Sequence, residues 1–418
     1  MDGANGAGGT TKAVVDGTHR SVPPGETLAR ITPHLPRFGI TRVANVTGLD
    51  ILGIPITVVT RPNSRSLSIS QGKGVTLDAA KVSGIMESVE QWHAENIELP
   101  LRLASYRELR RDITSGPPVP VDVSRLPGFV RPFNPDERIL WIEAKELGSN
   151  ARRMVPYEMV HLDLRLPLPQ GSGFFLAGSN GLASGNDLAE AVVHGICEVI
   201  ERDALTLFYR EPAERQHPRR VDLASVDDPL CVALIERFAR AEVDLAVWDL
   251  TRDTGVATFL ALASERQWNP FRVVGEARGS GTHPDRATAL SRALTEVAQS
   301  RLMRVVGSRD TLEETHLEAA RSETQAQRAR VHLEGQPGPI RFAAETGQRF
   351  ATLEEDLAFL QRQLDAAGLP EVLVVDLSRP EMPVRVARIV VPGLEAFCEM
   401  PGYVPGRRAQ AMAAAGGA

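Results

Sequence analysis

Carboxylate, amide and arginine side chains recur in this sequence at spacings that would gather them on one face of a helix. In the predicted helix 187–208 and the residue before it, Asn186, Glu190, Glu198 and Glu201 fall within roughly 120° of one another. Neighbouring carboxylates in a half-buried place are costly unless cations or donors offset their charge, so Mg²⁺ and arginine are the expected partners. The alternative is a solvated acidic face, and one helix alone does not decide between the two.

Two further predicted helices repeat this arrangement. The repeated side chains are Ser83, Glu87 and Glu90 in helix 76–97, and Glu296, Gln299 and Arg301 in helix 285–305. Each of the three helices follows a glycine-containing segment that we expect to be a loop: 70–74, 180–187 and 278–285. Helix N-termini after glycine loops bind anions, and Mg²⁺ is commonly held between phosphates and a few carboxylates. The repetition therefore favours a nucleotide–metal site over three solvated faces.

Motifs for other chemistries are missing from the sequence. Residues 70–74 do not match the Walker loop, and neither G-x-G-x-x-G after a strand, H-E-x-x-H nor G-x-S-x-G occurs. His93 and Glu95 form half of a zinc deaminase signature, but no P-C-x-x-C follows. We interpret His194 as a surface or core histidine and Cys197 as a packed apolar group.

Composition narrows the class of protein. The 418 residues are 43 % hydrophobic and 24 % charged, which is typical of a soluble globular protein. The net charge of −6 predicts no general basic surface, so we expect no nucleic acid partner. No run is long and apolar enough for a membrane span, and the N-terminus lacks a secretory signal. Three scattered cysteines indicate a reducing compartment, so we expect a cytoplasmic protein.

The elements that must position these side chains alternate between strands and helices, which predicts a mixed α/β (α+β) fold with one large core. Helices are expected at 25–37, 76–97, 104–111, 187–208, 228–240, 285–305, 310–333 and 352–368. Strands are expected at 40–46, 54–59, 67–69, 138–145, 153–156, 243–249, 258–264, 271–277, 371–376 and 384–391. We expect a disordered tail at 1–18, one domain at 19–402 with a connecting subdomain at about 105–170, and a flexible tail at 403–418.

Taken in order, these motifs resemble the YcaO superfamily. The matching patterns are S-x-G-K-G (70–74), S-x-x-x-E-x-x-E (83–90), N-x-x-x-E-x-x-x-x-x-x-x-E-x-x-E-R (186–202) and E-x-x-Q-x-R (296–301). The resemblance covers about residues 20–400 and implies a YcaO-type fold, with long helices around one ATP/Mg²⁺ site. It also implies that a peptide amide is activated by phosphorylation of its carbonyl oxygen.

The resemblance assigns roles to individual residues. Contacts to ATP are implied for Arg20, Thr27, Ser83, Asn186, Arg202 and Arg301. Mg²⁺ ligands are implied at Glu87, Glu90, Glu198 and Glu201, and catalytic roles at Glu190, Gln299 and Arg301. Gln91 departs from the pattern, because the family often has arginine there, and we expect it to contact phosphate more weakly. The chemistry suits these residue types, since phosphoryl transfer needs positioning and charge neutralisation rather than a protein nucleophile.

Family members differ in the nucleophile that attacks the activated amide. Azoline-forming members often end in a P-x-P-x-P tail, whereas residues 400–407 here read MPGYVPGR. Residues 39–74 and 91–95 look most like members paired with a TfuA-type partner in thioamide formation. The resemblance therefore implies thioamidation of a ribosomally made peptide with a separate TfuA-like partner, and azoline formation is the alternative. A homodimer is left open.

A function of a different class also stays open at this point. The chain could be a non-catalytic ATP-binding scaffold or regulatory partner of another enzyme. The complete acidic and arginine set argues against this, because a pseudoenzyme is expected to have lost some metal ligands.

Overall fold

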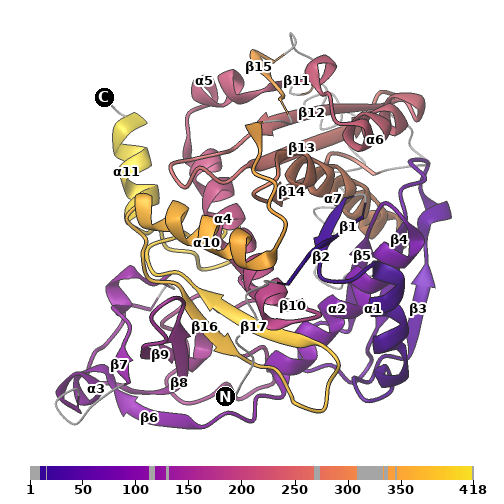
Figure 1. Cartoon of the computed structure of the whole chain (residues 1–418). Helices are drawn as coiled ribbons and strands as arrows, with labels where there is room; N and C mark the ends of the chain where they lie inside the picture. The colour runs from indigo at the N-terminus through magenta and orange to yellow at the C-terminus, as the bar shows by residue number, and fades with distance from the viewer. Residues whose placement is uncertain are drawn as a thin grey trace.

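The computed structural model describes residues 10–15, 17–112, 118–128, 131–267, 274–307, 333, 338–343 and 346–416. Within these ranges, sheets lie toward the outside, and α2, α4 and α7 run through the interior (Figure 1). The sequence predicted this mixed arrangement of strands and helices. Most of the predicted helix at 310–333 and part of the predicted strand at 271–277 lie outside the described residues.

Three strand–helix units carry the predicted site residues. Their bounds are β5 (Ile69–Lys73) with α2 (Leu77–Glu95), β10 (Leu182–Gly185) with α4 (Leu188–Arg210), and β14 (Ala277–Thr282) with α7 (Arg286–Val306). The helices are capped by Thr76, Asp187 and Asp285, each of which accepts a hydrogen bond from a main-chain amide three residues later. All three predicted helices are therefore confirmed to within two residues at each end.

The glycine segments before these helices are strands, so their prediction as loops was wrong. Glycine is needed there because the strand lies directly against the backbone of the following helix. A Cβ atom at Gly185 would come within 2.7 Å of the Ala191 amide nitrogen, and one at Gly281 would overlap the Ala289 carbonyl oxygen. The glycines thus permit close strand–helix packing rather than a phosphate-binding turn.

These three strands belong to three different sheets. The described residues form a seven-stranded sheet from β6 (Leu101–Ser105), β7 (Val119–Pro120), β8 (Arg138–Glu146), β9 (Arg152–Pro156), β10, β16 (Leu373–Asp376) and β17 (Arg385–Val390). Two three-stranded antiparallel sheets contain β3 (Arg42–Asn45), β4 (Ile56–Thr60) and β5, and β12 (Val243–Asp249), β13 (Thr258–Glu265) and β14. The site is therefore built where elements of all three sheets meet.

Shorter pairs and helices complete the described fold. The pairs are β1 (Ala13–Val15) with β2 (Thr18–Arg20), and β11 (Val221–Asp222) with β15 (Ile340–Arg341). The remaining α-helices are α1 (Pro24–Ile31), α3 (Tyr106–Asp112), α5 (Ala213–Gln216), α6 (Pro229–Arg240), α10 (Leu353–Ala366) and α11 (Arg407–Gly416). The predicted capping box of Thr352 and Glu355 is present at the start of α10.

Three predicted boundaries are corrected by the structure. The described residues 10–15, 17 and 18 are not a free tail, because β1 pairs with β2 and Lys12 pairs with Asp356 at 2.8 Å in the interior. Residues 403–418 include α11, where Arg408 binds both Asp203 and Asp253. The segment 105–170 is not a separate connecting subdomain, because β8 pairs with β16 in the seven-stranded sheet.

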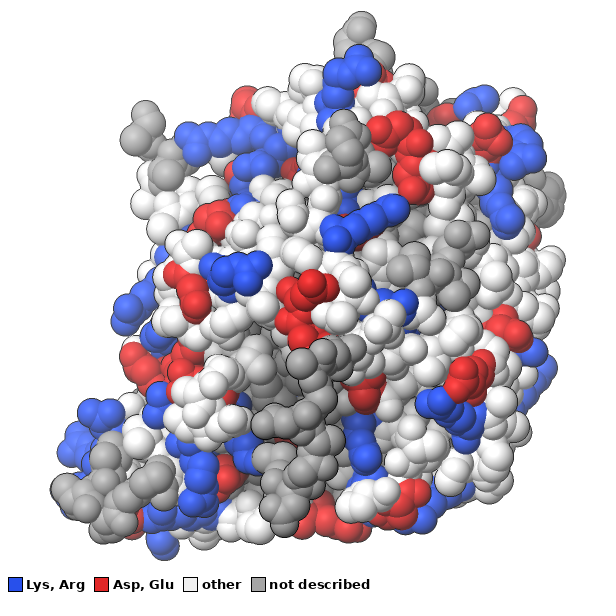
Figure 2. Space-filling view, in the orientation of Figure 1, with Lys and Arg blue, Asp and Glu red and all other residues white. Residues whose placement is uncertain are grey.

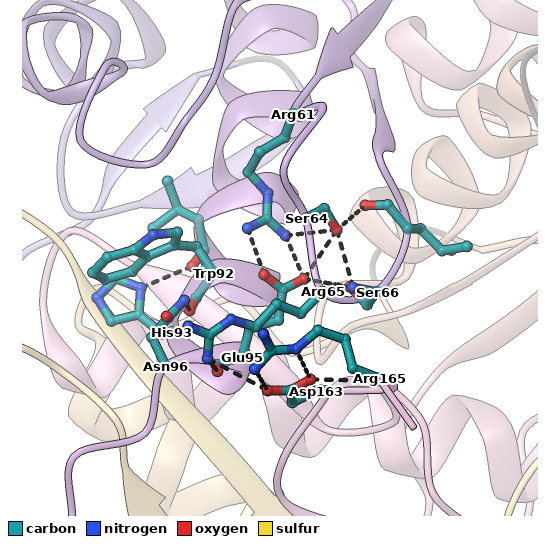
Figure 3. Close-up of polar contacts among 12 residues, drawn as sticks. Arg61, Ser64, Arg65, Ser66, Trp92, His93, Glu95, Asn96, Asp163 and Arg165 are labelled. Atoms are coloured by element: carbon teal, nitrogen blue, oxygen red, sulfur yellow. Dashed lines mark hydrogen bonds and ion pairs between the residues drawn. The ribbon is translucent and has the colours of Figure 1, made fainter. Parts of the chain in front are cut away.

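A buried ion pair fixes the C-terminal end of α2 (Figure 3). Both nitrogen termini of Arg61 donate to the Glu95 carboxylate, at 2.7 and 2.6 Å, and the Ser66 hydroxyl donates to the same carboxylate at 2.6 Å. Although burial alone would raise it, the pKa of Glu95 is lowered because Arg61 and Ser66 bind the ionised form. Glu95 therefore holds the chain between β4 and β5 against α2.

The visible surface in Figure 2 carries basic and acidic side chains interspersed, without one continuous basic face. This distribution agrees with the small net charge of −6. Among the described helices, none combines the length and apolar character that crossing a membrane requires.

Replacing Gly281 with alanine is expected to destabilise the protein, because the new Cβ would force β14 away from α7. The expected loss in free energy of unfolding is about 1–3 kcal/mol, as for other overpacked sites. Denaturant unfolding measures it, and Gly48→Ala is the matched control, because a Cβ there meets no atom within 4 Å. Equal stability of both variants would contradict the packing argument.

Candidate functional site

A cavity of about 570 Å³ lies between α2, α4, α7 and the segment that follows β1. Of the residues proposed from the sequence, those that line it are Arg20, Thr27, Ser83, Glu87, Glu90, Asn186, Glu190, Glu198, Glu201, Arg202 and Gln299. Residues separated by nearly 280 positions in the sequence are thus brought to one space. Arg301 is the one member of the predicted set that does not line it.

Glu190 joins the N-terminal segment to α4. Its carboxylate accepts hydrogen bonds from Arg20 at 3.1 Å, from the Ser21 amide and hydroxyl at 2.9 and 2.8 Å, and from Asn186 at 3.2 Å. Burial opposes ionisation, but Arg20 and the Ser21 hydrogen bonds outweigh it and lower the pKa of Glu190. With 3 % of its surface exposed, Glu190 is a charge that the protein itself already satisfies.

Thr27 completes this network. Its hydroxyl donates to the Asn186 side-chain oxygen at 2.9 Å, so the predicted N-terminal pair Arg20 and Thr27 meets the start of α4. Thr27 therefore positions Asn186, and Arg20 positions Glu190.

Among the described residues, Glu90 on α2 has no ion pair and accepts a hydrogen bond from the Ser184 hydroxyl at 2.6 Å, and Glu198 on α4 has only a long ion pair with Arg202. Burial raises the pKa of Glu90 to about 8, and the nearby charges of Glu198 and Glu87 act in the same direction. Burial likewise raises the pKa of Glu198 to about 7, although Arg202 at 4.0 Å partly offsets the shift. Both side chains would gain from a bound cation, which favours the ionised form.

Glu201 lies beside these acids and contacts β14. The Ser280 hydroxyl donates to it at 2.8 Å, and Arg202 lies 3.9 Å away. Glu296 on α7 is instead paired with Lys73 of β5. Burial would raise the pKa of Glu296, but Lys73 and Arg202 lower it. Gln299 donates to the Gln71 carbonyl at 3.4 Å and so links α7 to β5.

The cavity also carries a cation that sequence reasoning did not identify, Arg292. Arg292 donates to His194 Nε2 at 2.7 Å, and Arg20 lies 3.5 Å from the Nδ1 of the same ring. Burial and these two arginines hold the pKa of His194 well below its usual value, so the ring is neutral. Spacing on α7 could have identified Arg292, which lies four residues before Glu296.

Arg301 lies in the protein interior and does not line the cavity, which differs from its predicted contact with the nucleotide. It is 0 % exposed and binds the Asp50 carboxylate through two nitrogens, each at 3.0 Å, and Glu265 at 3.2 Å. The guanidinium therefore joins α7 to the loop after β3 and to the end of β13, away from the cavity. Arg301 lies two residues after Gln299, about 200° around the helix, which is consistent with this different direction.

The donor set suits Mg²⁺ bound together with phosphates rather than a metal held by protein alone. In the described part of the chain, no three histidine, cysteine or acidic side chains are grouped to hold a metal ion by themselves. Mg²⁺ typically takes one or two carboxylates and completes its shell with phosphate oxygens and water. Glu90, Glu198 and Glu201 supply such carboxylates beside a cavity large enough for a nucleotide.

A match between this sequence and a family model identifies the family of the chain. The YcaO family model, described as a YcaO cyclodehydratase that binds ATP and Mg²⁺, matches residues 71–395. This match covers most of the sequence, and the chain belongs to the YcaO family. The resemblance found in the motifs is thereby confirmed.

Relatives of similar length support this assignment. An uncharacterized protein in the tfuA 3′ region of Rhizobium leguminosarum bv. trifolii is 37% identical over 398 residues, which are 92% of this chain and 91% of the relative. An uncharacterized protein of Methanothermobacter thermautotrophicus is 34% identical over 395 residues, 93% of this chain and 98% of the relative.

Solved structures share the fold. The YcaO protein of Methanopyrus kandleri, bound with AMPPCP and Mg²⁺, has a TM-score of 0.72 and 23% identity, over 96% of this chain and 99% of that one. A heterocyclase in complex with substrate and cofactor has a TM-score of 0.78 and 23% identity over 96% of this chain. This chain spans 55% of that heterocyclase chain. The expected YcaO-type fold is confirmed.

Replacing Arg301 with methionine should lower the free energy of unfolding by about 3–5 kcal/mol, because Asp50 would remain as an uncompensated buried charge. Thermal and denaturant unfolding measure the loss. Arg240→Met is the control, since Arg240 is largely exposed and its change is expected to stay within about 0.5 kcal/mol. A variant with normal stability but without nucleotide affinity would instead place Arg301 at the nucleotide.

Proposed function

We propose that this protein uses ATP and Mg²⁺ to activate a backbone amide of a ribosomally made peptide by O-phosphorylation, leading to a thioamide. The observation that carries the proposal is the cavity of about 570 Å³, which is lined by acids on α2 and α4 and by Lys73 of β5 and Arg292 of α7. Acids and cations in one cavity suit a nucleotide, because its phosphates are stabilised by cations and its bound metal is held by carboxylates.

We assign roles to the lining residues accordingly. Glu87, Glu90, Glu198 and Glu201 are proposed to hold Mg²⁺, which when bound would neutralise phosphate charge. Contacts to ATP are proposed for Arg20, Thr27, Ser83, Asn186 and Arg202, and we add Lys73 and Arg292 as cations for its phosphates. Glu190 is proposed to act by positioning Arg20 and Asn186, because its own charge is already satisfied. Gln299 stays a predicted catalytic residue.

We propose that the residues lining the cavity promote phosphoryl transfer by electrostatic stabilisation. A peptide carbonyl oxygen attacks the γ-phosphorus of ATP, and Arg20, Arg292 and Lys73 stabilise the charge that develops on the phosphates. Neutral His194 fixes the direction of the Arg292 guanidinium, since its Nε2 accepts a hydrogen bond from that group. No side chain of the protein needs to form a covalent bond with the substrate.

Thioamide formation is favoured over azoline formation by a named relative. The Rhizobium protein, 37% identical to this chain, is described by its position in the tfuA 3′ region. We therefore propose a TfuA-like protein as the partner that delivers sulfur. The chain's three cysteines are all free, and we place the reaction in a reducing, cytoplasmic compartment.

Replacing Glu201 with glutamine should lower peptide-dependent ATP hydrolysis by about 10²-fold or more, because a carboxylate proposed for Mg²⁺ becomes a neutral amide. The amide oxygen can still accept the Ser280 hydrogen bond, so stability should change little. Glu236→Gln is the matched control on the exposed side of α6. Full hydrolysis by the Glu201 variant would refute its place at the metal, and hydrolysis that is absent from the wild type would favour the scaffold function.

The product is decided by intact mass spectrometry of candidate peptides. With ATP, Mg²⁺, sulfide and the TfuA-like partner, the peptide should gain the mass difference between sulfur and oxygen, because the amide oxygen leaves with phosphate. A loss of one water would identify azoline formation instead. Omitting the partner is the control, and it should abolish the gain.

A further inference from the structure

A second cavity of about 320 Å³ adjoins the first at its acidic end. The two cavities share Ser179, Glu198, Arg202 and Phe397. We refer to the second cavity as the side chamber. Most of its other walls are apolar and include Met159, Leu176, Val391, Leu394 and Met400. It provides space beside the proposed metal ligands that the nucleotide roles assigned above do not use.

One buried cation lines the side chamber. Arg388 on β17 is 2 % exposed, and its guanidinium donates to the main-chain carbonyls of Met159, at 2.7 Å from Nε, and of Gly178. Its Nη1 atom has no hydrogen-bond partner among the described residues, and no carboxylate in those ranges lies within 4.0 Å of the guanidinium. A buried cation with an unused donor is costly unless an anion or a hydrogen-bond acceptor reaches it.

The charges around Arg388 indicate what would bind there. Burial lowers the pKa of Arg388 to about 10, which leaves the guanidinium charged at neutral pH, and Glu198 is the acid that opposes the shift. Glu198 and Glu395 both line the chamber and would repel an anion. The Mg²⁺ proposed at Glu198 would cancel the first repulsion, and the Glu395 carboxylate is already bound by the Tyr403 hydroxyl and the Gly406 and Ala409 amides. The apolar walls disfavour a large, strongly hydrated ion. A small, weakly hydrated anion therefore fits this chamber best once the metal is bound.

We propose that the side chamber, through Arg388, binds hydrosulfide, the anionic nucleophile that attacks the activated amide. This proposal rests on the thioamide function proposed above. It assigns the nucleophile to a space that opens beside Glu198 and Arg202, where the activated carbonyl would lie.

The chemical step balances without an oxidant or reductant. The amide oxygen forms a bond to the γ-phosphorus of ATP while the bond from that phosphorus to the bridging oxygen breaks, and ADP leaves. Hydrosulfide then adds to the amide carbon through sulfur. The carbon–oxygen bond breaks, phosphate leaves with that oxygen, and loss of the S–H proton gives the C=S bond.

The first test locates an anion without requiring turnover. Crystals of the full chain with Mg²⁺ and a non-hydrolysable ATP analogue are soaked in bromide, whose anomalous scattering marks its position. A peak in the side chamber beside the side-chain cation of residue 388 is expected in the wild type and in Arg388→Lys, and it should be lost in Arg388→Met. No peak in the wild type, or an unchanged peak in Arg388→Met, which would mark an adventitious ion only, overturns the proposal.

The second test measures the dependence on sulfide with the TfuA-like partner present. Arg388→Met should raise the KM for sulfide at least tenfold, whereas the dissociation constant for the ATP analogue stays unchanged. Arg388→Lys should recover part of the affinity because it keeps the charge. Arg385→Met on the same strand is the matched control, since Arg385 lines neither cavity. If Arg388→Met fails to fold, competition of bromide with sulfide, but not with ATP, tests the same site in the wild type.

Phosphate is the other small anion of the proposed reaction, and the kinetic test distinguishes its binding in the side chamber from that of hydrosulfide. If Arg388→Met weakens product inhibition by phosphate and leaves the KM for sulfide unchanged, the side chamber belongs to the leaving group and the proposal is wrong. If the wild type makes no thioamide under any condition, the proposed function fails, and the bromide result alone then shows whether the anion site exists.

Discussion

The close backbone contact between each site helix and the strand that precedes it determines the geometry of this protein. Gly72, Gly185 and Gly281 lie where a Cβ atom would meet helix backbone, so α2, α4 and α7 lie directly against β5, β10 and β14. Because these strands belong to three separate sheets, the contacts also bring the sheets toward one centre. The cavity forms between the three helices, and these helices fix the positions of most of its acidic and basic side chains.

Within that cavity the carboxylates fall into two physical groups. Glu190 and Glu296 are paired with cations of the protein, and their pKa values are lowered despite burial. Glu90 and Glu198 have no close ion pair, and burial raises their pKa values to about 8 and about 7. The first group fixes the surrounding elements, whereas the second retains unsatisfied charge that an external cation would stabilise.

The sequence was sufficient for the three helices around the cavity and for most residues that line it, because the 3.6-residue period and the capping residues are local signals. Prediction from the sequence was wrong where contacts between distant segments determine the local structure. The glycine segments read as loops because glycine is typical of turns, yet packing against a helix requires glycine in those strands. Arg301 follows Gln299 by two residues, which turns it by about 200° on the helix, so it faces Asp50 rather than the cavity. Lys73 and Arg292 were missed because their acidic and imidazole partners come from other elements.

Glu198 belongs to the carboxylates without a short ion pair, and it lines both the large cavity and the side chamber. Glu198 and Arg202 lie between the large cavity and the side chamber, so one charged wall faces two compartments. A nucleotide bound in the large cavity would be reached from the side chamber past Glu198 and Arg202, which line both. The Arg388 guanidinium is held there by two main-chain carbonyls, which fix its position but leave its charge without a close counter-ion. The reactants proposed for the two compartments can therefore approach the same acidic wall from different directions, as addition to an activated carbonyl requires.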